Sequence, residues 1–304
     1  MGAIEIQGLT KEFGDVTAIK DLNLEVNDGE VYGFLGPNGA GKSTTINILL
    51  DFIRPTEGSA TVLGLDAQDK SVEVRDRTGV LPEAFGLYDR LTGRKHIEFA
   101  IRSKGADDNP EAILERVGLE DSGSRKAGGY SKGMKQRLGL GIALVGDPDL
   151  LILDEPSTGL DPNGAREMRQ IVREEKERGA TVFFSSHILE QVEKSCDRVG
   201  ILRDGKLVAQ DSIEGLRDEL GTESVLSISV DAIPDGTLQR IKGLQGVTDV
   251  TAEDNTITVK CGESTAKNEI LRAVEELGAE ITDFSTQEAS LEELFASYTT
   301  GGEG

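Results

Sequence analysis

Residues 36–43, with the sequence GPNGAGKS, have the residue types and spacing of a loop that binds phosphate. Glycines let the backbone curl so that successive N–H groups point at one anion, and a helix starting at the same place adds its positive end. Lys42 can reach the β- and γ-phosphates of a nucleotide, and the Ser43 hydroxyl can bind Mg²⁺. The residues expected to hold the phosphates are Gly36, Pro37, Asn38, Gly39, Ala40, Gly41, Lys42, Ser43 and Thr44.

Two adjacent acids, Asp154 and Glu155, follow the apolar run at residues 150–153. A buried strand that ends in an acid places Asp154 beside the phosphate loop, where it can hold Mg²⁺ directly or through water. Glu155 is suited to act as a general base that polarises an attacking water. Such a pair is common at strand ends, but its position roughly 110 residues after the loop indicates a nucleoside-triphosphate hydrolase.

Short apolar runs alternate with helical patterns up to about residue 220. Buried strands are expected at residues 29–35, 150–153 and 181–184, and helices at residues 42–52 and 188–194. Strands that alternate with helices predict a parallel sheet covered on both faces, and therefore an α/β fold.

Three other regions have patterns of their own. Residues 4–26 alternate as short antiparallel strands, and residues from about 84 to 146 are mostly helical, which predicts a helical subdomain. Residues 222–300 show the order βαββαβ, which is typical of a ferredoxin-like α+β domain, followed by a helix at 291–298. We therefore expect a first domain over residues 1–220 and an accessory domain over 222–300.

The chain of 304 residues is strongly acidic, with 33 Lys and Arg against 55 Asp and Glu and a net charge of −22. Residues 222–304 carry half of this charge, −11, in about a quarter of the length. Such a surface repels phosphate backbones, so no nucleic-acid partner is expected. A strongly anionic surface also suits a salt-rich cytosol, where screening removes the self-repulsion, although an ordinary acidic protein is the alternative. Two cysteines without metal-ligand spacing and the lack of a long apolar run favour a cytoplasmic protein.

Residues 130–137 (YSKGMKQR), here called the signature segment, carry a family resemblance. They lie just ahead of the acidic strand, where ATP-binding subunits of ABC transporters have LSGGQxQR. Ser131, Gly133, Gln136 and Arg137 match this pattern, whereas Tyr130, Lys132 and Met134 depart from it. The resemblance implies a P-loop NTPase (RecA-like) core with an antiparallel β subdomain and a helical subdomain. It also implies that Ser131 and Gly133 bind the γ-phosphate of ATP held by the opposite subunit. The charge of Lys132 either favours a phosphate or is simply solvated.

Four further positions take roles from this resemblance. Asp161, in the segment STGLD at residues 157–161, corresponds to the D-loop that communicates across the dimer. His187 resembles the histidine that contacts the γ-phosphate, with a structural histidine as the alternative, and His96 is interpreted as structural. Phe13 occupies the place of the aromatic that stacks on adenine, although it fits a core position equally well. Glu83 stands where the family usually has glutamine near Mg²⁺ and the membrane partner.

Within this family, the chain resembles the exporter-type (ABC-2-like) group, because one ATPase unit is followed by a C-terminal domain. The signature segment also resembles ATPases of nitrous-oxide-reductase maturation, linked to copper-centre assembly, and subunits that export drugs, antibiotics or sodium. The resemblance implies an ATP- and Mg²⁺-dependent ATPase that dimerises head-to-tail around two ATP, with Lys42, Glu155 and His187 catalytic and with Ser43, Asp154 and Glu83 near the metal. It implies an integral membrane permease as the partner and a peripheral location on the inner membrane face.

Two other functions remain open from the residues. A soluble ABC protein of translation or DNA repair is one, although such chains usually carry two ATPase units or a long coiled coil. A P-loop kinase is the other, but it would need neither the signature segment nor His187. The accessory domain either regulates or stabilises a dimer, or is a passive appendage.

Overall fold

The computed structural model describes residues 2–219, 224–261 and 264–287. The chain divides into two compact units, Met1–Gln210 and Asp211–Gly304. The expected boundary near residue 220 therefore falls inside the second of these units. Among the described residues, no helix is long and apolar enough to cross a lipid bilayer.

A six-stranded sheet forms the centre of the first unit, and its strand order is β10-β9-β3-β8-β7-β6. Strands β3, β7 and β8 are buried along their whole length, as expected for parallel strands covered on both faces. The pairs β9–β3, β3–β8, β8–β7 and β7–β6 are all parallel. The bounds are β3 (Val31–Leu35), β6 (Thr78–Leu81), β7 (Leu150–Asp154), β8 (Thr181–Ser186), β9 (Arg198–Arg203) and β10 (Lys206–Ser212).

The register of these strands brings their carboxyl ends to one edge. Leu35 pairs with Ser186, Asp154 pairs with Ser185, and Leu81 pairs with Leu153. In open parallel sheets, ligands bind beyond the carboxyl ends of the strands. The chain therefore leaves β3, β8, β7 and β6 side by side at the edge where a ligand would bind.

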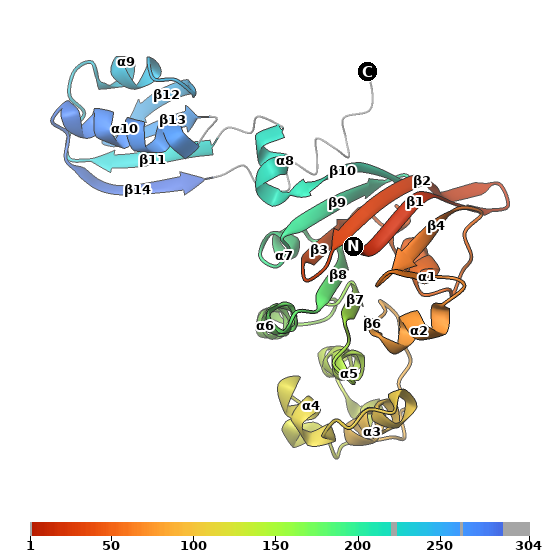
Figure 1. Cartoon of the computed structure of the whole chain (residues 1–304). Coiled ribbons are helices and arrows are strands. Elements are labelled where there is room, and N and C mark those ends of the chain that lie inside the picture. Colours follow the sequence, from red (N-terminus) through yellow and green to blue (C-terminus); the bar gives the residue numbers. More distant parts are fainter. Residues whose placement is uncertain (1, 220–223, 262–263, 288–304) are drawn as a thin grey trace. The chain divides into compact units, whose positions relative to one another are not determined.

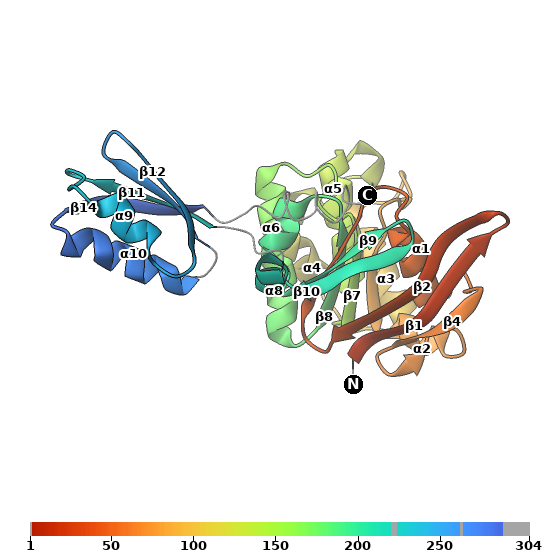
Figure 2. The ribbon, with the colours of Figure 1, turned by 90° about the horizontal axis from the view of Figure 1, so that it is seen from above.

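An antiparallel sheet of order β2-β1-β4-β5 packs against the central sheet. Figure 2 shows the long β1–β2 hairpin in red, with β4 alongside it. Ile4 and Leu24 of this sheet share one buried apolar core with Phe34, Phe183 and Ile48. The bounds are β1 (Gly2–Phe13), β2 (Val16–Asn27), β4 (Glu57–Val62) and β5 (Leu65–Asp66). Strands β1 and β2 have 12 residues each, so they are longer than the short strands expected.

Some helices cover the central sheet. Others, which come between β6 and β7 in the chain, form a separate group. This group is the expected helical subdomain, and Figure 1 shows it in yellow beyond α5, at the opposite end of the unit from β1 and β2. Side chains of Thr92, Asn109 and Ser131 cap the first turns of its three α-helices, α3, α4 and α5. The helical elements of the first unit are α1 (Lys42–Leu49), α2 (Ser71–Asp76), α3 (Gly93–Lys104), α4 (Pro110–Arg116), η1 (Glu120–Ser122), η2 (Ala127–Gly129), α5 (Lys132–Leu144), α6 (Pro162–Arg178) and α7 (Leu189–Glu193).

The second unit contains the order βαββαβ after a first helix, α8 (Ile213–Glu219). Its sheet has the order β12-β13-β11-β14, which is the ferredoxin-like arrangement that the sequence predicts. Ile228 and Val259 of the sheet share a buried core with Ile270 and Val274 of α10. The bounds are β11 (Ser224–Val230), α9 (Thr237–Lys242), β12 (Val247–Glu253), β13 (Thr256–Cys261), α10 (Ser264–Glu276) and β14 (Ile281–Gln287). The helix expected at residues 291–298 lies outside the described residues.

Candidate functional site

A cavity of about 210 Å³ lies at the carboxyl edge of the central sheet. It joins the loop after β3 to residues that follow β6 and β7, and to one residue of β2. The lining residues are Ala18, Pro37, Asn38, Gly39, Gly41, Lys42, Ser43, Thr44, Glu83 and Glu155. The structure thus brings most of the expected phosphate-binding residues together with two of the expected acids. Ala18 was not expected there, because an alanine in a strand carries no chemical signal.

The loop needs glycine at Gly41 for two reasons. Its φ of 110° lies in the left-handed region, and a Cβ atom there would come within 2.7 Å of the carbonyl oxygen of Ala18. Gly41 is also the N-cap of α1, and no side chain caps that helix. The first N–H groups of α1 have no carbonyl partner within the helix, so they are available to an anion.

Lys42 is buried with its ammonium group folded back onto the loop. Its Nζ donates to the carbonyl oxygen of Gly36 at 2.7 Å and lies 3.6 Å from Oε1 of Glu155. The loop N–H groups and the ammonium form the positive part of the cavity, and two carboxylates, those of Glu83 and Glu155, line it as well. N–H groups and an ammonium of this kind are the donors that phosphate oxygens accept from.

Glu155 is buried beside Lys42 and contacts His187. Its Oε2 lies 2.8 Å from Nδ1 of His187, whose side chain is about half exposed. Its Oε1 is buried and has no hydrogen-bond partner in the described part of the chain. Oε1 has the Lys42 ammonium nearby but accepts no hydrogen bond from the described residues, and a buried carboxylate oxygen without one is costly unless a ligand or water donates to it. Oε1 therefore marks a place where a hydrogen-bond donor is expected. This geometry fits a base that accepts a proton from water.

Asp154 lies next to the cavity but does not line it. It is 4% exposed, and its Oδ1 accepts a hydrogen bond from the hydroxyl of Ser185. Like Ala18, Ser185 is not singled out by the sequence, because a serine at the end of a buried strand has no distinctive spacing. The structure therefore adds a third polar side chain to the acidic strand end.

The donor set at this edge fits Mg²⁺. Within the described residues, no three His, Cys, Asp or Glu side chains form a metal-binding group. Mg²⁺ does not need one, since it is usually bound by one or two protein oxygens together with phosphate oxygens and water. The hydroxyl of Ser43 and the carboxylate of Asp154 are hard oxygen donors of that kind, and Glu83 lines the same cavity.

Six of the expected nucleotide-binding residues do not line this cavity: Gly36 and Ala40 in the loop itself, and Phe13, Ser131, Gly133 and Asp161 in other segments. Phe13 is 48% exposed, and Nζ of Lys11 lies 4.9 Å from the centroid of its ring. Ser131 caps α5 by accepting from the N–H of Met134, and Asp161 caps α6 by accepting from the N–H of Gly164 at 2.7 Å. Gly133 lies in the first turn of α5. Ser131, Gly133 and Asp161 therefore form no part of the cavity lining in their own chain.

The signature segment packs against the loop that follows Glu155. Nε2 of Gln136 donates to the carbonyl oxygen of Pro156 at 3.0 Å. The stem of Lys132 passes over Gly159, where a Cβ atom would come within 2.5 Å of the lysine Cδ. Lys132 thus contacts the D-loop of its own chain through its methylene groups.

Two family models match the chain. Residues 19–158 match the family described as ABC transporter, and residues 212–299 match the C-terminal domain described for DrrA1-3-like ATP-binding proteins. The chain is 33% identical over 308 residues to the linearmycin resistance ATP-binding protein LnrL of Bacillus subtilis (strain 168), covering 97% of this chain and 98% of the relative. It is 34% identical over 304 residues to the bacitracin transport ATP-binding protein BcrA of Enterococcus faecalis, covering 98% and 97%.

Solved structures are similar to part of the chain. One is a dimeric ATP-binding cassette in a post-hydrolysis state bound to ADP and Pi, with a TM-score of 0.64 and 25% sequence identity. The similarity covers 69% of this chain and 98% of that chain.

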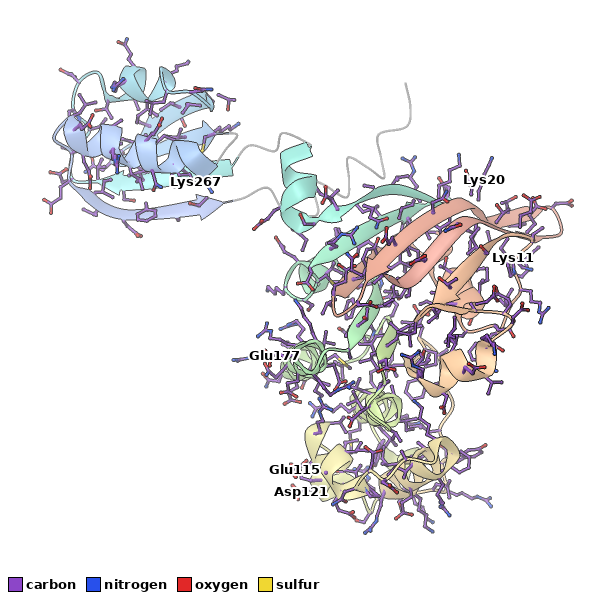
Figure 3. The ribbon with its side chains drawn as sticks, in the orientation of Figure 1. Lys11, Lys20, Glu115, Asp121, Glu177 and Lys267 are labelled. Carbon is purple, nitrogen blue, oxygen red and sulfur yellow. The ribbon has the colours of Figure 1, made fainter. Side chains whose placement is uncertain are left out.

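Replacing Lys42 by alanine tests the phosphate lining. We expect the affinity for ATP to fall roughly tenfold or more, because a charge-assisted hydrogen bond to phosphate is lost. Titration of a fluorescent ATP analogue measures this. Lys20→Ala is the matched control, since it removes one positive charge from an exposed site on β2 (Figure 3). An unchanged affinity in Lys42→Ala would contradict the assignment.

Proposed function

The chain belongs to the ABC transporter family as an ATP-binding subunit with ATPase activity, and from that premise we propose that it powers export through a separate membrane subunit. The observation that carries this is the single cavity that joins the phosphate loop, Glu155 and Glu83. Support for export comes from LnrL and BcrA, which are similar to nearly the whole chain. The name of LnrL describes resistance, and the name of BcrA describes transport. Those names do not concern copper-centre assembly, translation or DNA repair, so none of these is part of the proposal.

We propose the following roles for the residues at the cavity. The N–H groups of Gly39 and of residues 41–44, together with the ammonium of Lys42, hold the phosphates, whereas the N–H of Ala40 donates to the carbonyl oxygen of Pro37. Ser43 and Asp154 hold Mg²⁺, which supplies charge neutralisation at the β- and γ-phosphates when it is bound. Oε1 of Glu155 accepts a proton from the attacking water, while Nδ1–H of His187 donates to Oε2. When the ring carries both protons, Nε2–H donates to the γ-phosphate. Glu83 positions a water at the same edge of the cavity.

A second copy of the chain completes the site in this proposal. Ser131, Gly133 and Asp161 do not line the cavity of their own chain, which supports a head-to-tail dimer in which each copy presents them to the other's nucleotide. Helix α5 begins within the signature segment. The positive end of the helix dipole therefore adds to the positive charge that faces the γ-phosphate. Phe13, exposed at the end of β1, is available to stack on adenine.

Replacing Glu155 by glutamine tests its role as the base. We expect ATP turnover to fall roughly 100-fold or more, since the amide cannot take the proton, while ATP binding persists. The protein should then accumulate as an ATP-bound dimer, which size-exclusion chromatography with light scattering detects. Glu115→Gln, an exposed position on α4, is the control for the loss of one charge. Unchanged turnover in Glu155→Gln would refute the assignment.

An apolar groove of about 730 Å³ is the proposed docking site for the membrane subunit. It lies between the segment after β6, which carries Glu83, and helices α3 and α5. Phe99 lines it and is 60% exposed, and the ring of His96 holds this segment by accepting from the N–H of Tyr88 at 3.0 Å. A helix or loop of a permease that fills this groove would contact the same segment that borders the nucleotide cavity. In this proposal, a movement of that segment when ATP binds is passed on to the membrane subunit. Docking there also holds the chain on the cytoplasmic face of the membrane.

Replacing Phe99 by aspartate tests this docking surface. We expect the tagged chain to lose the multispanning membrane protein that co-purifies with it from detergent extracts, because a charge in the groove opposes an apolar partner. ATP binding should persist. Phe52→Asp is the matched control, since Phe52 is 64% exposed and is absent from the groove lining. Equal recovery of the same membrane protein with both variants would contradict the proposal.

The acidic surface supports adaptation to a salt-rich cytosol. Glu115, Asp121 and Glu177 are exposed at the outer edges of α4, η1 and α6 (Figure 3). With a net charge of −22, self-repulsion in dilute buffer is long-ranged, whereas about 1 M salt shortens the screening length to about 3 Å.

The free energy of unfolding should therefore rise on the order of 1 kcal/mol or more between dilute buffer and 2 M KCl, because screening relieves the repulsion among carboxylates. Urea denaturation at each salt concentration measures it. Glycine betaine at matched osmolality is the control, since osmolytes stabilise proteins without screening charge, and the gain in KCl should exceed the gain in betaine. Full stability in dilute buffer, with no gain in KCl, would count against the salt adaptation.

A further inference from the structure

Ser185 is a fully buried side chain at the carboxyl end of β8. It lies directly beside Asp154 of β7 in the parallel register. Side chains of residues paired in this way point to the same face of the sheet. Ser185 therefore faces the strand end that carries the two acids.

One residue contacts both acids at this point. The Ser185 hydroxyl donates to Oδ1 of Asp154. Its oxygen also accepts the backbone N–H of Glu155 at 3.2 Å, and the carbonyl oxygen of Ser185 accepts the same N–H at 3.2 Å. Ser185 thus fixes the side chain of one acid and the backbone of the next.

The backbone of Glu155 needs such support. Its φ of 50° lies in the left-handed region, which is unfavourable for a residue with a long side chain and persists only where neighbours hold it. Ser185 holds its N–H, and His187, two residues further along the same chain segment, holds its carboxylate. Residues at and just after the end of β8 therefore hold both the backbone and the carboxylate of Glu155.

We propose that Ser185 is a positioning residue of the ATPase site. By donating to Oδ1, it holds the carboxylate of Asp154 in one orientation, the one in which Asp154 would meet Mg²⁺. By holding the N–H of Glu155, it keeps Oε1 directed to the position of the attacking water. This inference rests on the proposed roles of Asp154 and Glu155.

Mn²⁺ binding to the ATP-loaded protein tests it, measured by electron paramagnetic resonance. Ser185→Ala should weaken Mn²⁺ affinity about tenfold or more, as is usual when a hydrogen bond to a metal-binding carboxylate is lost. Metal-free binding of a fluorescent ATP analogue should stay within twofold of wild type. Turnover should fall by the same order as Mn²⁺ affinity, and Ser185→Thr, which keeps the hydroxyl, should restore both.

Thr181→Val is the matched control at the other end of β8. Thr181 is also buried, and its hydroxyl accepts a backbone N–H, that of Gly29, at 2.8 Å, so the variant loses a comparable hydrogen bond far from the acids. If Ser185→Ala does not fold, Ser185→Cys, which keeps the volume and weakens the donor, is compared with Ser185→Thr in the same assay.

Mn²⁺ affinity within twofold of wild type in the alanine or cysteine variant would overturn the inference. So would an equal loss in Thr181→Val, since the effect would then reflect the stability of the strand. If wild-type protein does not hydrolyse ATP, the proposed roles in catalysis fail separately, because the Mn²⁺ comparison does not depend on turnover.

Discussion

The parallel register of β3, β8, β7 and β6 is the constraint on which the site depends. Each strand contributes one kind of group where it ends: β3 the phosphate loop, β8 Ser185 and His187, β7 the two acids, and β6 the segment with Glu83. These segments are far apart in the sequence, and only the strand order makes them neighbours. A slip of one residue in any pairing would turn its side chains to the other face of the sheet.

The site holds buried charge in an arrangement that the protein alone does not fully satisfy. Lys42 folds onto its own loop and approaches Glu155, yet Oε1 of Glu155 has no hydrogen-bond partner in the described chain. Removing either charge would leave the other uncompensated, which is costly in a buried position. The unsatisfied atom is an acceptor, so the site calls for a bound group that donates a hydrogen bond to Oε1. ATP with its attacking water meets that demand, and the backbone strain at Glu155 is concentrated at the same point.

Local chemistry in the sequence predicted the parts of the site, and long-range pairing decided which parts meet. The phosphate loop could be predicted because its glycine spacing lets the backbone N–H groups turn toward one anion. The acidic pair could be predicted because it follows an apolar run typical of a buried strand. The alternation of β11 and β13 likewise predicted the ferredoxin-like unit. The contact of Ser185 with the acids could not be predicted from the sequence, since it arises only from the pairing of β8 with β7. Ser131 and Asp161 instead cap helices of their own chain, and the role toward nucleotide proposed for them requires a second copy, which one chain does not supply.

A mixing experiment tests the composite site most directly. Lys42→Ala breaks the phosphate lining, and Ser131→Asp keeps a good helix cap but adds a negative charge where the γ-phosphate would lie. In a mixed head-to-tail dimer, the Ser131→Asp copy supplies an intact Lys42 and the Lys42→Ala copy an intact Ser131, so one complete site forms. The account predicts that two inactive preparations regain ATPase activity when mixed. Activity no higher than the sum of the separate preparations would contradict it.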